Sequence, residues 1–139
     1  MIEVEIDIPV PHEKVWACLT QNEHIHHWWS EGVSLDRKNG GKFSEVWTDL
    51  QGQKHETSGI VTALENKIRL QMDWKDKNWP KATRVEFLLS PWQGGTKLTL
   101  QHSGWGIFDD KTRQKIVDDY RAGWLEIMDK LKDYCIHKK

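Results

Sequence analysis

Apolar and polar residues alternate with a period of two in short segments along most of this chain of 139 residues. In residues 2–8, isoleucine or valine occupies every second position, and acidic residues lie between them. This alternation is typical of half-buried antiparallel strands, because successive side chains of a strand point to opposite faces. Turn sequences such as Gln93-Gly94-Gly95 separate the segments. The sequence predicts about seven strands, at residues 2–8, 32–36, 42–48, 53–64, 67–74, 82–90 and 96–102, with a bulge or bend near Gly59.

Helical patterns occur in only two regions. After the first strand, Pro11 suits the start of a short helix that carries Val15 and Trp16, and a second short helix follows at residues 22–29. From about residue 110 to 134, apolar side chains recur at spacings of three and four and form one stripe on a rod of about 37 Å. The stripe consists of Ile116, Tyr120, Trp124, Ile127, Leu131 and Tyr134.

The order of these elements allows few packing arrangements, and we expect a single domain over residues 1–139. One strand, two short helices, six strands and one long helix favour an α+β fold in which a curved antiparallel sheet wraps around the last helix. A curved sheet and a straight helix diverge toward one end, so a gap is expected between them. Side chains either fill this gap or leave it open as a pocket.

Nine residues are tryptophan, which is several-fold above ordinary usage. Each ring buries roughly 150–250 Å² and keeps one N–H donor, so these rings either build a core or line a concave apolar site. We expect most of them in the core. Trp105, in the run from His102 to Gly106, and Trp124, which follows Gly123, favour the second role. A helical glycine costs about 1 kcal/mol relative to alanine, so Gly123 indicates either a close backbone approach or a need for room there.

Charge and hydropathy argue against several classes of function. Lysine and arginine total 20 against 21 acidic residues, a formal charge of −1, and no long run of one sign would attract nucleic acid. No segment approaches the roughly 20 apolar residues of a membrane span, and the N-terminus resembles no signal peptide, so we expect a cytoplasmic protein. Cys18 and Cys135 lack metal-ligand or redox spacing and are expected as free thiols. We expect no cofactor, and a monomer or weak dimer.

Residues that could carry chemistry are scattered. His24 and His27 share one helix face without a zinc motif, so we interpret them as a solvated polar face. Alternation places His102 on the inward face of its strand, which is typical of a hydrogen-bonded core histidine. If Phe43 points inward, Glu45 does too, and burial would raise its pKa unless a donor such as His102 pairs with it. No nucleophile motif or phosphate loop is recognisable, which favours a binding protein over an enzyme.

The chain resembles the START-like helix-grip superfamily, also called the polyketide cyclase or birch-pollen-allergen-like fold. Within it, nearly the whole chain is similar to the C-terminal domain of the activator of the large heat-shock ATPase. The residues that carry the resemblance are Pro11, Val15-Trp16, Trp28, Gly40-Gly41, Phe43, Gly52, Gly59, Trp74, Thr96, Leu98, His102-Ser103-Gly104-Trp105, Gly123-Trp124 and Leu131. Leu64-Glu65-Asn66-Lys67 replaces the usual proline-rich turn before the fifth strand, a departure that is compatible with the fold.

The resemblance and the expected gap together predict that the chain binds a small hydrophobic or amphipathic ligand between sheet and helix. The residues expected at this site are Trp47, Met72, Trp74, Phe87, His102, Trp105, Tyr120, Trp124 and Ile127, with His102 as a polar anchor.

Two alternatives remain: a chaperone-linked interaction module of the stress response, and a cyclase or hydrolase that uses the same cavity. The eukaryotic activators carry a separate N-terminal domain that is not found in this sequence, so we expect no stimulation of a chaperone ATPase by this chain alone. An outward patch that included Trp79 and Trp92 would favour the interaction module.

Overall fold

A computed structural model describes residues 1–138. Within these residues the chain forms seven strands, three α-helices and one short 3-10 helix, close to the positions that the sequence predicted. In chain order they are β1 (Ile2–Ile8), α1 (His12–Thr20), α2 (Asn22–Trp28), β2 (Val33–Leu35), β3 (Lys42–Thr48), β4 (Lys54–Glu65), β5 (Arg69–Asp76), β6 (Thr83–Trp92), β7 (Gly95–Ser103), η1 (Trp105–Ile107) and α3 (Asp110–His137). The expected α+β helix-grip fold is confirmed.

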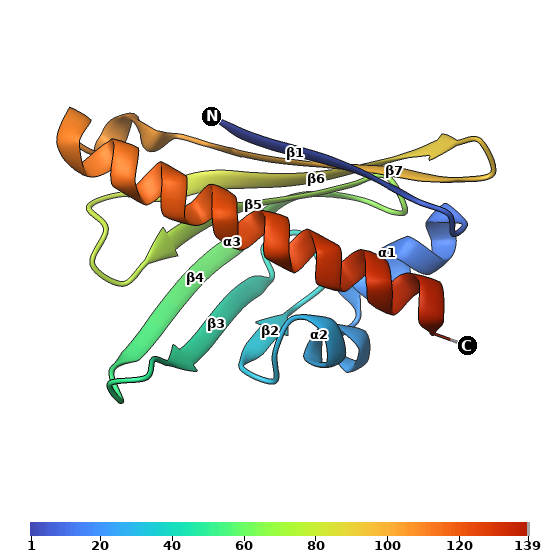
Figure 1. The fold of residues 1–139 in the computed structure, drawn as a ribbon, viewed down its shortest axis with the longest axis horizontal. Helices are drawn as coiled ribbons and strands as arrows, with labels where there is room; N and C mark the ends of the chain where they lie inside the picture. The colour runs from blue at the N-terminus through green and yellow to red at the C-terminus, as the bar shows by residue number, and fades with distance from the viewer. Residues whose placement is uncertain (139) are drawn as a thin grey trace.

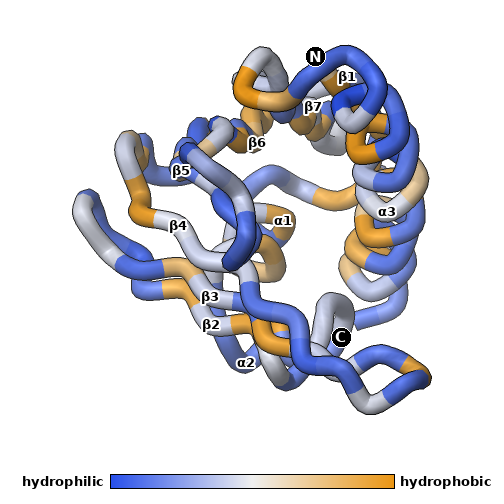
Figure 2. The backbone as a smooth tube through the Cα atoms, turned by 90° about the vertical axis from the view of Figure 1, so that its left-hand side faces the viewer, coloured by the Kyte–Doolittle hydropathy of each residue, from blue (hydrophilic) through white to orange (hydrophobic). Residues whose placement is uncertain are grey.

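The strands of the described part form one antiparallel sheet in the order β1-β7-β6-β5-β4-β3-β2. Figure 1 shows α3 crossing one face of this sheet, with α1 and α2 beside its C-terminal end. In the view turned by 90°, the sheet forms an arc and α3 closes its open side (Figure 2). The sheet therefore curves around the helix, as the order of elements predicted.

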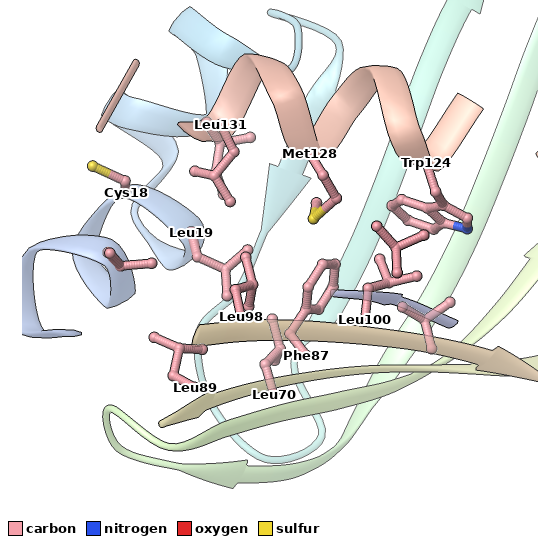
Figure 3. Close-up of a cluster of buried hydrophobic side chains, with 14 of the residues drawn as sticks. Cys18, Leu19, Leu70, Phe87, Leu89, Leu98, Leu100, Trp124, Met128 and Leu131 are labelled. Carbon is pink, nitrogen blue, oxygen red and sulfur yellow. The ribbon is translucent and has the colours of Figure 1, made fainter. Parts of the chain in front are cut away.

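The long helix α3 begins at Asp110, because the side chain of Asp109 accepts a hydrogen bond from the backbone N–H of Thr112 at 2.8 Å. Its buried face points at the sheet, and Figure 3 shows three of its side chains above Phe87 and Leu98. The fully buried residues of α3 are Trp124, Met128, Leu131 and Cys135. The residues of the predicted stripe are all buried or partly buried against the core, but the prediction left out Met128 and Cys135. None of the helices in residues 1–138 is long and apolar enough to cross a membrane.

Strand β4 carries the irregularity that the sequence predicted. Its pairing with β5 shifts register between Val61 and Ala63, which is where the bulge lies. Gly59 has a different role, because a Cβ atom at this position would overlap the backbone carbonyl oxygen of Asp73. The absence of a side chain at Gly59 allows the two strands to approach each other.

Candidate functional site

A pocket of about 450 Å³ opens between one half of the sheet and the middle of α3. Its walls come from β3, β4, β5, the loop that joins β5 to β6, and α3. The sheet contributes Glu45, Trp47, Lys54, His55, Glu56, Thr57, Trp74 and Asp76; the loop contributes Lys77, Asn78 and Trp79; and α3 contributes Asp119, Tyr120, Gly123, Trp124 and Ile127.

The path of α3 explains why the pocket lies here. The helix packs against β1, α1, α2 and η1, whereas β3 and β4 curve away from it (Figure 2). Gly123 lines the pocket, and a Cβ atom built on it would have no atom within 4 Å. A close backbone approach, one of the two explanations that the sequence left open for this glycine, is therefore excluded, and room beside Trp124 is the other.

Aromatic rings form most of the inner wall of the pocket. The ring of Trp74 lies 5.2 Å from that of Trp124 between centroids, and Trp79 lies 5.5 Å from Tyr120. Trp74 and Trp124 are almost completely buried, so each ring exposes only an edge or part of a face to the pocket. Trp47 lies farther out and is 47% exposed, with its ring stacked on His55 at 4.3 Å. The inner part of the wall is therefore apolar, and its outer part at β3 is exposed to solvent.

A chain of hydrogen bonds crosses the pocket wall from β5 to α3. The indole N–H of Trp74 donates to the hydroxyl of Tyr120 at 3.0 Å, and this hydroxyl donates to the carboxylate of Asp76 at 2.8 Å. Thr57 of β4 donates a second hydroxyl to the same carboxylate. Burial, and then the negative charge of Asp76, raise the pKa of Tyr120 well above its ordinary value. Tyr120 is therefore a fixed neutral donor to Asp76.

Glu45 is the second carboxyl group of the pocket. Phe43 points into the core and is 2% exposed, and Glu45, two residues further along β3, is half-buried and faces the pocket. Burial raises the pKa of Glu45, the indole N–H of Trp29 partly offsets this effect, and the charge of Asp76 adds to it. The condition set by the sequence, that Glu45 turns inward with Phe43, is met. His102 is not its partner, since both ring nitrogens of that histidine are bonded elsewhere.

His102 lies behind the aromatic wall and is completely buried. The indole N–H of Trp124 donates to its Nδ1 at 3.0 Å, so this nitrogen is an acceptor and Nε2 carries the proton. Nε2 then donates to the hydroxyl of Thr83 at 2.7 Å, and that hydroxyl donates to the backbone carbonyl of Trp74 at 2.8 Å. Burial lowers the pKa of His102 to about 3, which keeps the ring neutral. The expectation of an inward, hydrogen-bonded histidine agrees with this geometry.

The structure separates the nine residues expected at the site into two groups. Five of them line the pocket: Trp47, Trp74, Tyr120, Trp124 and Ile127. The structure places the other four, Met72, Phe87, His102 and Trp105, in the core beyond the pocket wall. Side chains of α3 fill the space in front of them; the ring of Trp124, for example, lies 6.0 Å from that of Phe87. The alternation of apolar and polar residues therefore identified the inward face of each strand. It did not show which inward side chains lie in the core and which line the pocket.

Sequence reasoning missed Asp76, Thr57 and Trp79, and did not assign Glu45 to the site. A signal for the two acidic residues was present, because Asp76 has the same strand parity as Trp74, and Glu45 lies between Phe43 and Trp47. Polar residues near strand ends usually face solvent, which hid this parity. Trp79 gave no such signal, because it follows β5 in a loop whose path depends on α3.

Of the histidines of α2, only His24 differs from the solvated face that the sequence suggested, because His26 and His27 are exposed. His24 is buried, with Nδ1 2.8 Å from the hydroxyl of Tyr134 on α3, and His26 Nε2 lies 2.9 Å from the backbone oxygen of Val33. The solvated interpretation was wrong for His24 because the end of α3 covers this part of α2. Among residues 1–138, no cluster of three or more histidine, cysteine or acidic side chains has the arrangement of a metal site.

Comparison with known families identifies the fold on independent grounds. The sequence model of the family described as "Activator of Hsp90 ATPase homolog 1-like protein" matches residues 9–135. The chain belongs to this family. The resemblance to helix-grip proteins is thereby confirmed, and the matched stretch contains every residue that lines the pocket.

Solved structures share the fold over nearly the whole chain. Protein MLL2253 from Mesorhizobium loti is 25% identical, with a TM-score of 0.79, and the match covers 99% of this chain and 98% of that one. CalU16 from Micromonospora echinospora is also 25% identical, with a TM-score of 0.71 and coverage of 96% and 74%. The Aha1 dimer from Colwellia psychrerythraea is 21% identical, with a TM-score of 0.78 and coverage of 99% and 97%. No protein with curated annotation matches the sequence.

Proposed function

We propose that this protein binds a small hydrophobic or amphipathic molecule in the pocket between β3, β4, β5 and α3. The observation that carries the proposal is the pocket itself: about 450 Å³, with tryptophan and tyrosine rings along its inner wall. Pockets for small molecules have volumes of about 300–1,000 Å³ and combine apolar walls with a few fixed polar groups. Asp76 and Glu45 are such polar groups here, and Tyr120 and Thr57 hold Asp76 in place.

Gly123 supports the same proposal from the helix side. A glycine in the middle of α3 lowers helix stability by about 1 kcal/mol relative to alanine, and no neighbouring atom requires it. A function that needs the space beside Trp124 accounts for this cost.

A fluorescence titration with a matched pair of variants tests the proposal. N-phenylnaphthylamine is an uncharged aromatic probe of suitable size, and it should quench tryptophan emission with saturable affinity. Gly123→Leu places a side chain in the pocket and should weaken probe binding by about tenfold or more, since it removes most of the contact area. Ala122→Leu adds a similar side chain to the adjacent exposed position and should leave binding unchanged. Absence of saturable binding, or equal binding by both variants, would contradict the proposal.

A cyclase or hydrolase would use the same pocket, so the ligand must also be followed over time. We expect it to be recovered unchanged after prolonged incubation, because the lining includes no serine or cysteine, and its two hydroxyl groups beside a carboxylate, those of buried Thr57 and of Tyr120, are held by Asp76. A product that forms with time and disappears in the Gly123→Leu variant would favour the enzyme instead.

The second candidate, a chaperone-linked module, is favoured by the family match and by the likeness to the Aha1 dimer. The tryptophans proposed as a marker of such a surface give it no support. Trp79 packs against Trp105 and Phe108 near α3, and Trp92 lies at the opposite end of β6 beneath Lys97. We expect no rise in the ATPase rate of the host chaperone at stoichiometric protein, and a several-fold rise would promote this candidate.

A further inference from the structure

Four side chains of the inner pocket wall already use their hydrogen-bond donors within the protein. The indole N–H of Trp74 donates to Tyr120, and the hydroxyl of Tyr120 donates to Asp76. The hydroxyl of Thr57 also donates to Asp76, and the indole N–H of Trp124 donates into the core. The inner wall therefore has no free donor on these residues for an anionic or carbonyl group of a ligand.

Acceptors, in contrast, remain open. A carboxylate offers about four lone-pair positions, and Asp76 receives only two hydroxyl donors. Across residues 1–138, no lysine, arginine or histidine nitrogen lies within 4 Å of the carboxyl group of Asp76 or Glu45. Lys54, which also lines the pocket, pairs with Glu56 at 3.3 Å. The pocket thus contains two carboxyl groups without a cationic partner, on the two strands that flank Thr57 of β4.

The aromatic wall favours the same sign of charge. The faces of indole and phenol rings carry partial negative charge and attract cations within about 6 Å, most strongly where water is excluded. Trp74, Trp79 and Tyr120 line the pocket together with Asp76, so a cation beside this carboxylate would also lie among aromatic rings. A carboxylate in the same place would be repelled by the carboxylate of Asp76.

We infer that the pocket selects amphipathic amines, with the ammonium group bound by Asp76 and Glu45 and the apolar part lying among the rings of Trp74, Trp79 and Trp124. The inference rests on the proposed function, because it names the ligand class of the same pocket. The ammonium group supplies the positive charge that is missing beside these two carboxyl groups, and hydrogen bonds to charged groups are the stronger ones.

Competition among three matched ligands tests this inference at pH 7. Phenylbutylamine, phenylbutanol and phenylbutanoate share one apolar skeleton and differ in the charge of the head group. Each is added to the complex with N-phenylnaphthylamine, and displacement of the probe gives the affinity. We expect the amine to bind about tenfold or more tightly than the alcohol, and the carboxylate to bind more weakly than both. Equal affinities, or a preference for the carboxylate, would overturn the inference while leaving ligand binding intact.

Variants that remove one carboxylate charge test which residues produce the preference for amines. Asp76→Asn and Glu45→Gln keep the side-chain volume, and each should reduce the amine-to-alcohol ratio several-fold while the affinity for the alcohol stays nearly unchanged. Asp118→Asn is the matched control, because this exposed residue of α3 pairs with Arg121 at 3.8 Å and does not line the pocket. Circular dichroism checks that each variant is folded. If Asp76→Asn does not fold, the result for Glu45→Gln tests the inference. A preference that survives in both variants would overturn the inference, and no displacement by any ligand together with no probe binding would contradict the proposed function itself.

Discussion

The buried histidine of β7 makes the stability of this protein depend on pH in a way that can be calculated from the structure. His102 is completely buried, accepts a hydrogen bond from Trp124 and donates one to Thr83. A second proton on its ring would place an N–H at Nδ1 directly opposite the indole N–H of Trp124. The charged ring would also be buried away from solvent. We therefore expect the folded state to exclude the charged ring down to strongly acidic pH.

The size of the effect follows from the two pKa values. The unfolded chain titrates at about 6.5, whereas burial lowers the pKa of His102 in the folded protein to about 3. Because the folded pKa lies below the unfolded one, the unfolded state binds the proton first, and stability is lost as pH falls from about 6.5 toward 3. The slope in this window is about 1.4 kcal/mol per pH unit. Between pH 7 and pH 5, His102 alone should lower the free energy of unfolding by about 2 kcal/mol.

Urea unfolding of the wild type and of His102→Gln at pH 7 and pH 5 measures this contribution. Glutamine keeps one donor and one acceptor in a side chain that does not titrate. The variant should be less stable at pH 7, but its loss between pH 7 and pH 5 should be smaller than that of the wild type by about 2 kcal/mol. Other groups, including His24, whose pKa burial also lowers, affect both proteins equally. If both proteins lose the same free energy, the reasoning about His102 is refuted.

Three further predictions concern α3 and the two cysteines. Gly123→Ala should raise the free energy of unfolding by about 0.5–1 kcal/mol in urea titration, since its Cβ meets no atom; a loss would show that the room is needed for folding. Trp124→Ala should cost about 3–5 kcal/mol, because the ring is 1% exposed, and a loss below about 1.5 kcal/mol would contradict its role as core. Cys18 and Cys135 should both react in a thiol titration of denatured, unreduced protein, and fewer than two reactive groups per chain would count against free thiols.

Local periodicity predicted the elements of this fold almost completely. The alternation in β1 and the apolar spacing in α3 are properties of neighbouring residues, and each side chain keeps the face that its own position gives it. These local patterns and the order of elements were together sufficient to predict a sheet curved around a helix. The inward positions of Trp74, Tyr120 and Trp124 were found in the same way.

The tertiary structure decided what lies in front of each inward side chain. Phe87 and Trp74 have the same alternation signal, yet α3 fills the space over Phe87 and leaves space beside Trp74. Two further examples are His24, which is buried only because Tyr134 of α3 covers it, and Cys135, whose pKa is raised by the thiol of Cys18 from another helix and by burial. Each of these depends on the distance between elements far apart in the sequence. Periodicity determines the direction of a side chain, but only the convergence of several elements determines whether it meets a neighbour, a carboxylate or an open pocket.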